Sequence, residues 1–250
     1  TPVMKDADSP SATLLLNDGP YLSENSEDTT LTLSGTTGSV TVTASAVTGI
    51  NSGSGFLSTD VGRLLRWHDG TDWTWLEITA LTDTTHVTAT IKGEDAAVTT
   101  ATERWRLGAW SQTTGFPRTT TYYQQRQFYA STTDELGRID GSAINDFVDF
   151  SPGTAEDDEA LNYELNSNGV YAIYWLVGSS KKLRIGTEDG VWVAWSGSTT
   201  STISPTSIQA DLDIDSRCKE LAPVVVADTT LFVERNGKKH TEYNPIKTKT

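Results

Sequence analysis

Leu64-Leu65-Arg66-Trp67-His68-Asp69-Gly70, followed by Trp73-Thr74-Trp75-Leu76-Glu77-Ile78, is the clearest structural signal in the chain. Polar and apolar residues alternate around Asp69-Gly70, as they do in strands with one buried face. Asp-Gly between two such runs is the strongest short signal for a β-hairpin. The segment predicts two antiparallel strands with Trp73 and Trp75 on one face of the second. We expect at least one of these two side chains to be buried, because large aromatic residues dominate core burial.

The composition extends this prediction to the whole chain. Its 250 residues include 40 Thr and 20 Gly against one Met. Thr is β-branched and suits a pleated surface better than a helix, and Thr41-Val42-Thr43 alternates as half-buried strands do. The predicted fold class is all-β. Only residues 156–166 (from Glu156) and 213–222 (from Asp213) are expected to form short helices.

The charge and the cysteine content exclude several classes of protein. The chain has 19 basic and 33 acidic side chains, a formal net charge of −14. This excess of acid argues against tight nonspecific binding of nucleic acid, which relies on Lys and Arg. With Cys218 alone there is neither a disulfide framework nor a thiolate zinc site. No run approaches the ~20 apolar residues of a membrane span, and because the chain does not begin with Met we expect a processed protein or a piece of a longer one.

The sequence predicts a linker and two structural regions. Residues 1–20 are expected to be a linker, because they contain Pro2, Pro10 and Pro20 among polar residues. Residues 21–113 contain about six short strands and predict a small β-barrel or sandwich. A boundary follows at 115–118, and residues 114–250 repeat a plan of strand, turn and strand three times.

The repeat spacing in the second region is typical of β-propeller blades. From Phe128 to Leu183 to Leu231 the spacing is 55 and then 48 residues. Periods of about 40–50 residues with several strands each indicate blades, and a closed propeller typically has 4–8 of them. We therefore expect three blade-like units that form part of a propeller-like region of antiparallel sheets.

Few residues suggest chemistry. His68, His86 and His240 lack neighbours at metal-ligand spacing, and we expect His68 to be an exposed hairpin residue. No Gly-x-Ser-x-Gly occurs, so a nucleophile elbow is not predicted. Residues 51–55 (Asn51-Ser52-Gly53-Ser54-Gly55) are glycine-rich but lack the Lys of a phosphate-binding loop, and we expect a flexible loop. We predict no enzyme, and no catalytic, cofactor-binding or metal residues.

Two acidic clusters and the tryptophans leave alternatives open. Residues 156–159 (Glu156-Asp157-Asp158-Glu159) are expected to be a solvated loop or a helix N-terminus. Asp211, Asp213 and Asp215 would share one face of a strand and could hold Ca²⁺, but Ser216 stands where a calcium loop needs Gly. Trp67, Trp73 and Trp75 are expected to fill a core for the most part, with a glycan-binding surface as the alternative.

A series of short motifs, in order along the chain, resembles one protein family. The motifs are Gly19-Pro20-Tyr21-Leu22 with Asn25, residues 56–66 (Phe56 to Arg66), residues 73–80, Phe116-Pro117-Arg118, Gln125-Arg126, residues 128–131, residues 145–150, Trp175-Leu176-Val177, residues 183–187, Gly190-Val191-Trp192, Pro205-Thr206, Pro223 and residues 231–238. Together they resemble the tail nozzle, or tail tubular protein B, of short-tailed bacteriophages. Residues 56–80 are similar to a domain named after the first catalytic-cysteine half-domain of ubiquitin-activating enzymes, although no catalytic cysteine lies in this segment.

The resemblance implies a structural virion protein in the phage tail. Such nozzles form a ring, expected to be six-fold, which contacts other tail proteins (adaptor and fibres) and conducts DNA outward without binding it specifically. It implies no membrane segment and no cofactor. The family's chains are longer, so this chain is expected to be a central piece. The alternative function is a receptor-binding, glycan-binding or depolymerase module of the tail.

Overall fold

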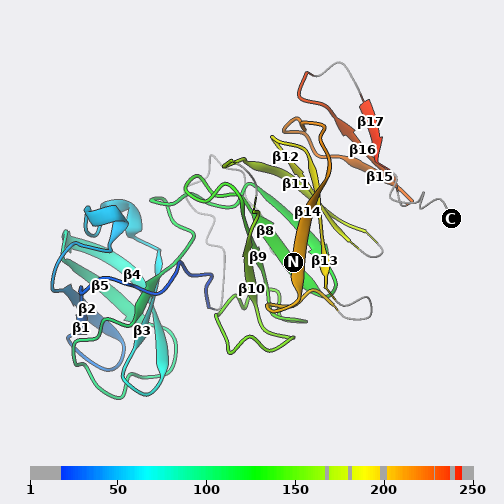
Figure 1. The fold of residues 1–250 in the computed structure, drawn as a ribbon. Coiled ribbons are helices and arrows are strands. Elements are labelled where there is room, and N and C mark those ends of the chain that lie inside the picture. The colour runs from blue at the N-terminus through cyan, green and yellow to red at the C-terminus, as the bar shows by residue number, and fades with distance from the viewer. Residues whose placement is uncertain are drawn as a thin grey trace.

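The computed structural model describes residues 18–166, 169–179, 182–197, 202–227, 229–236 and 240–243. These residues form strands and two short 3-10 turns, η1 (Asn51–Gly53) and η2 (Ser58–Asp60), with no α-helix among them. The strands assemble into four antiparallel sheets (Figure 1). The all-β prediction is therefore confirmed.

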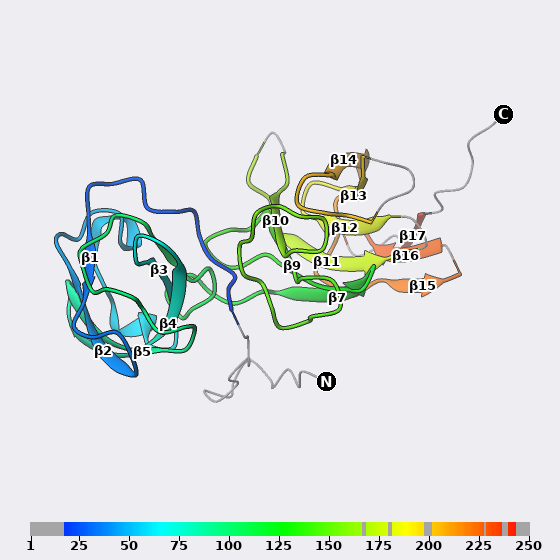
Figure 2. The same ribbon diagram turned by 90° about the horizontal axis from the view of Figure 1, so that it is seen from below.

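The first sheet has six strands that curl into a half-barrel (Figure 2). Its strand order is β1-β2-β5-β4-β3-β6. The two ends of the sheet approach each other, because Leu31 and Thr102 exchange both of their backbone hydrogen bonds. One apolar cluster, which includes Phe56, Leu65 and Trp67, fills the interior. The strands are β1 (Leu31–Leu33), β2 (Ser39–Ala44), β3 (Leu64–His68), β4 (Trp73–Asp83), β5 (His86–Ile91) and β6 (Trp105–Leu107).

The hairpin formed by β3 and β4 is confirmed, but its tryptophans lie on the unexpected side. His68 pairs with Trp73 across the turn, and Trp67 pairs with Thr74. Trp67 is fully buried, and its indole N–H donates to the carbonyl of Leu31. Because side chains alternate between faces, Trp73 and Trp75 both lie on the outer face of the half-barrel. Both side chains are only half-buried. The prediction that Trp73 or Trp75 is buried is wrong.

Three further sheets follow, and each is an up-and-down meander of consecutive strands. The strands of each sheet follow one another in space as they do in the chain (Figure 1). The first sheet of this region contains β7 (Thr119–Tyr123), β8 (Arg126–Ala130), β9 (Arg138–Gly141) and β10 (Leu161–Glu164). The second contains β11 (Ile173–Gly178), β12 (Leu183–Thr187), β13 (Val191–Ser196) and β14 (Ile208–Ile214), and the third contains β15 (Val224–Val226), β16 (Thr229–Val233) and β17 (His240–Tyr243). Phe128, Leu183 and Leu231, between which the repeat spacing was measured, lie on β8, β12 and β16, one strand of each sheet.

The three meanders pack face to face. Phe128 and Ile139 of the first sheet share a core with Leu183 and Ile185 of the second. On its other face the second sheet packs Trp175 and its neighbours against Phe232 of the third sheet. The edge strands β7 and β11 lie against each other. The middle sheet is thus covered on both faces, and every residue of β12 is buried.

Both short helices expected from the sequence are absent. Residues 156–160 form an irregular loop, and Leu161–Glu164 is strand β10, which pairs with β9 from Gly141 to Arg138. Residues 213–214 end strand β14, and the described residues after them are irregular up to β15. For residues 161–164 and 213–214, pairing with an existing strand provides hydrogen bonds that compete with local helix propensity.

The segment after the expected linker joins the half-barrel to the sheets. Residues 1–17 of the expected linker 1–20 lie outside the described residues. The residues that follow are packed, because Phe150 donates its N–H to Asp18, and Ala109 donates to Pro20. We call residues 21–27 the strap, since they run along the free edge of β6. Leu22 donates its N–H to Leu107 of β6, and Arg138 of the first meander donates to the carbonyl of Tyr21, residue 21 of the strap.

Candidate functional site

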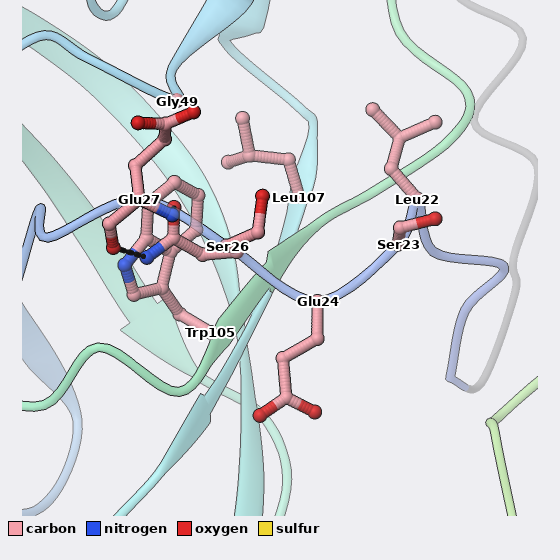
Figure 3. Close-up of a pocket in the computed structure, with 9 residues that line it drawn as sticks. Leu22, Ser23, Glu24, Ser26, Glu27, Gly49, Trp105 and Leu107 are labelled. Atoms are coloured by element: carbon pink, nitrogen blue, oxygen red, sulfur yellow. Dashed lines mark hydrogen bonds between the residues drawn. The ribbon is translucent and has the colours of Figure 1, made fainter.

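The strap borders two adjoining hollows of about 490 and 210 Å³. Leu22, Glu27, Gly49 and Leu107 line both, and we call the two together the strap groove. Figure 3 shows the smaller hollow, where the Glu27 side chain extends toward Gly49 while Glu24 points to the other side of the strap.

A buried ion pair includes Arg63, one of the residues that line the larger hollow. The Asp60 and Arg63 side chains are both 0% exposed, and Arg63 Nη1 lies 2.9 Å from Asp60 Oδ1. Arg63 Nε donates to the carbonyl of Gly108 at 2.8 Å, and Nη1 also donates to Asn51 Oδ1 at 2.7 Å. Its Nη2 is buried and has no hydrogen-bond partner among the described residues. Burial lowers the pKa of Arg63, and the charges of Asp60 and Asp134 oppose that shift.

The glycine-rich loop at residues 51–55 is held by this ion pair. Asn51 Nδ2 donates to the carbonyl of Gly55 at 2.9 Å and to Asp60 Oδ2 at 2.7 Å. The N–H of Leu57 donates to the same carboxylate oxygen. The loop was expected to be flexible, but Asn51 forms hydrogen bonds through both its side-chain nitrogen and its side-chain oxygen. The loop therefore forms a fixed wall of the groove.

Two carboxylates also line the larger hollow. Asp134, in the loop between β8 and β9, and Glu27 of the strap both line the larger hollow. Gly49 has φ +81°, and a Cβ there would lie 2.7 Å from Asn25 Oδ1, so only glycine fits this close approach to the strap. Because Asp60 balances the charge of Arg63, the two other carboxylates give the groove an excess of negative charge.

The outer face of the half-barrel gathers arginines around Trp73. The guanidinium carbons of Arg66, Arg104 and Arg106 lie 5.3, 5.1 and 5.7 Å from the centre of its rings. Arg104 and Arg106 both form ion pairs with Glu24 of the strap. Arg66 donates to the carbonyl of Pro152 at 2.7 Å. These arginines fasten the strap and the first meander to the half-barrel.

The residues singled out from the sequence do not form a common site. His68 was expected to be exposed, but it is only 7% exposed, because its Nδ1 accepts the N–H of Gly70 and its ring packs edge-on against Trp73. Cys218 is buried, and burial raises the pKa of its thiol to about 12. His86 is close to Asp83, whereas the side chain of His240 lies outside the described residues.

The two acidic clusters also remain apart. Residues 156–159 are a largely exposed loop, as one of the two expectations stated. Asp211 and Asp213 lie on strand β14, whose register with β13 shifts between Leu212 and Ile214, and Asp215 follows the end of that strand. Across the part of the chain that the structure describes, no three His, Cys, Asp or Glu side chains are grouped to hold a metal ion.

The third meander has an exposed apolar edge strand. Strand β15 lies at the edge of its sheet, and Val224, Val225 and Val226 are 60, 43 and 58% exposed. Val224 pairs with Leu231 and Val226 with Thr229, so these side chains face away from the second sheet. Exposed apolar edge strands invite pairing with another chain.

Comparisons with known proteins leave the family unassigned. The sequence matches no protein-family model and no curated protein. None of the described helices is long and apolar enough to cross a membrane.

The groove residues were not found from the sequence. Glu27, Arg63 and Asp134 are far apart in the chain and meet only through the strap and the β8–β9 loop. The one local signal is Asp60 three residues before Arg63, a spacing at which the two side chains form their ion pair. That signal does not reveal the unpaired Nη2.

Proposed function

We propose that the chain is a structural subunit of the tail nozzle of a short-tailed bacteriophage. In this role it works in the virion tail as part of a ring, six-fold by resemblance, through which DNA leaves the particle. Adaptor and fibre proteins of the tail are its proposed neighbours. The chain is proposed to act without catalysis and without specific binding of DNA.

One observation carries the proposal: among the described residues, the stacked meanders end in an exposed apolar edge strand. The second sheet is buried on both faces by its neighbours, whereas β15 of the third sheet exposes three consecutive valines. A contiguous apolar edge is a liability for a monomer and typical of a surface that is covered in an assembly. The net charge of −14 also supports a conduit, because acidic surfaces do not retain phosphates.

Sedimentation of the purified chain tests this role. We expect concentration-dependent association, and replacement of Val224 and Val226 by Lys should reduce it, because two charges cannot be buried in an apolar contact. Val170→Lys is the control, since Val170 is 76% exposed and lies before β11 rather than on the third sheet. A chain that stays monomeric at all concentrations, or native particles with the protein away from the tail axis, would contradict the proposal.

A glycan-binding or depolymerase module remains the second candidate function. The half-exposed position of Trp73 and Trp75 on the outer face of the half-barrel favours it. Against it, Trp73 is surrounded by three guanidinium groups that also fasten the strap. Digestion of host polysaccharide by the chain, lost on replacement of a carboxylate, would favour this second function over the nozzle.

A further inference from the structure

The basic side chains of the half-barrel that reach the surface lie on one face of its sheet. Residues 18–113 contain five basic side chains against twelve acidic ones. Arg63 is the fully buried member of the five. The other four are exposed or half-buried and are Arg66, Lys92, Arg104 and Arg106. Because this part of the chain is acidic as a whole, a gathering of its positive charges on one face favours contact with a negatively charged partner.

The strand register places three of these cations in one row across the sheet. Arg66 of β3 pairs with Arg106 of β6 on one side and with Trp75 of β4 on the other. The carbonyl of Trp75 accepts the N–H of Lys92, which directly follows β5. Residues that pair directly across antiparallel strands point to the same face. Since neighbouring strands lie about 4.8 Å apart, the row crosses the sheet over about 14 Å.

A second row beside the first contains the other tryptophan of the hairpin. His68 pairs with Trp73, and the His68 N–H donates to the carbonyl of Arg104. The guanidinium of Arg104 lies 5.1 Å from the centre of the Trp73 rings. Half-buried indole rings therefore lie among the cations in both rows. We call this surface the basic face; its residues are Arg66, Trp73, Trp75, Lys92, Arg104 and Arg106.

The cations of the basic face are in excess and open to solvent. Among the described residues they outnumber the carboxylates that act on them, which are Glu24, Glu77 and, near Arg66, Asp18. Arg104 is 53% exposed in its pair with Glu24, and Lys92 is 43% exposed in its pair with Glu77. Exposed ion pairs contribute little stability, so a phosphate group can replace either carboxylate.

The indole rings distinguish between two classes of acidic partner. An acidic protein surface would use the four charges but not the aromatic rings between them. A single strand of nucleic acid uses both, because cations follow its phosphates while aromatic rings stack on its bases. The alternation of Arg66, Trp75 and Lys92 along one row matches the second pattern.

We propose that the basic face binds single-stranded nucleic acid without sequence specificity. The strand crosses β6, β3, β4 and the end of β5, its phosphates lie against the four cations, and one base stacks on Trp75. The acidic charge of the rest of the chain keeps the contact weak and reversible. The binding needs no assembled ring, so it is independent of the nozzle proposal.

Fluorescence anisotropy of a labelled oligothymidylate of about twelve nucleotides tests the basic face of the full chain. We expect saturable binding at low salt. The logarithm of the association constant should fall with the logarithm of the salt concentration with a slope of about −2 to −3, because each of three or four neutralised phosphates of a single strand contributes about −0.7. An absence of binding at about 20 mM salt, where charges are screened least, would overturn the proposal.

Two substitutions on the basic face should change the binding in opposite directions. Arg104→Ala should weaken it severalfold and make the salt slope shallower by about 0.7. Glu24→Gln should strengthen it severalfold, because the carboxylate that competes with phosphate for Arg104 and Arg106 is lost. Melting curves of each variant separate a change in binding from unfolding.

Arg235→Ala is the matched control. Arg235 is 55% exposed and pairs with Glu188, which is 32% exposed, whereas Arg104 and Glu24 are 53 and 30% exposed. Arg235 follows β16 of the third meander and lies outside the basic face. Its loss should leave the binding constant and the slope unchanged, and equal effects of Arg104→Ala and Arg235→Ala would contradict a localised site.

Two further probes test the class of partner. Trp75→Leu should weaken binding of oligothymidylate about fivefold or more but leave binding of an abasic strand of the same length unchanged, because only the stacked base is lost. Equal losses for the two strands would exclude stacking on Trp75. Binding of poly-L-glutamate as tight as that of oligothymidylate of equal charge would indicate an acidic protein as the partner instead. None of these readouts depends on self-association, so a failure here leaves the nozzle proposal to its own test.

Discussion

Asp60→Ala is the most informative single change in the half-barrel. The carboxylate accepts four hydrogen bonds, from Arg63 Nη1 at 2.9 Å, Leu57 N at 2.9 Å, Asn51 Nδ2 at 2.7 Å and Thr113 Oγ1 at 2.6 Å. Both side chains of the ion pair are 0% exposed. Removing one partner of a buried pair leaves an uncompensated charge and costs about 3–5 kcal/mol. For a chain of this size that corresponds to a fall in melting temperature of roughly 6–20 °C.

Urea unfolding followed by tryptophan fluorescence measures this cost. The control is Glu77→Ala, which breaks the ion pair with Lys92 on the same half-barrel, where the side chains are 35 and 43% exposed. An exposed pair contributes about 0–1 kcal/mol, so the control should change the unfolding midpoint little. An Asp60→Ala cost no larger than that of Glu77→Ala would contradict this prediction.

A double-mutant cycle with Arg63→Met separates the ion pair from the rest of the network. Each single variant leaves a buried charge, whereas Asp60→Ala combined with Arg63→Met leaves none. The double variant should therefore lose less stability than the two single losses together, with a coupling energy of about 0.5–3 kcal/mol. Additive losses would mean that Asp60 and Arg63 stabilise the loop independently of each other.

Three further predictions concern single side chains. Trp67→Ala should cost about 3–5 kcal/mol of unfolding free energy. Trp73→Ala should cost clearly less, because only Trp67 is fully buried. Equal losses of stability in thermal melts would contradict the placement of the two tryptophans. The Cys218 thiol, with its pKa raised to about 12 by burial, should react with a thiol reagent at pH 8 only after unfolding, and fast labelling of the native chain would refute this. The pKa of Asp83 is lowered from 3.8 to about 2, first by the hydrogen bond with His86, so this contribution to stability is present above pH 3.8 and is lost as the pH falls toward 2. His86→Ala should return the pKa of Asp83 toward 3.8 in a carboxyl NMR titration, and an unchanged midpoint would exclude His86 as the cause.

The sequence predicted those elements whose signal is local. The Asp69-Gly70 turn and the alternation beside it specify a hairpin with few alternatives, and the structure has it between β3 and β4. The repeat spacing is a signal of the same kind, because Phe128, Leu183 and Leu231 lie on one strand of each of the three meanders. Local periodicity also indicates that a strand has two different faces.

Periodicity does not tell which face is buried, and this explains the error over the tryptophans. The inner face of the half-barrel already contains Trp67 and Trp105, whose indole N–H groups donate to Leu31 and Thr29. With two indoles in that interior, the face that carries Trp73 is turned outward. The choice depends on packing across strands that are distant in the sequence, so a single strand cannot reveal it.

The candidate site could not be predicted for a related reason. Arg63 looks like one more basic residue beside a turn, and Asp134 and Glu27 look like surface acids. Their meeting depends on the strap, which reaches β6 because Leu22 donates to Leu107 and Arg138 holds residue 21 from the other side. The unpaired Nη2 becomes apparent only when every hydrogen bond of Arg63 is counted.

The sheet stack itself provides an argument for assembly that does not depend on resemblance. The second meander can bury both faces, with Ile185 on one side and Trp175 on the other, only because a sheet lies on each side of it. The third meander repeats this arrangement on one side, where Phe232 packs inward at 1% exposure, while Val224 faces outward at 60% exposure. Its outer face thus has the composition of a covered surface without a cover among the described residues. Since burial of apolar area is the dominant favourable contribution to association, a further sheet or a neighbouring subunit on this face would lower the free energy of the whole stack.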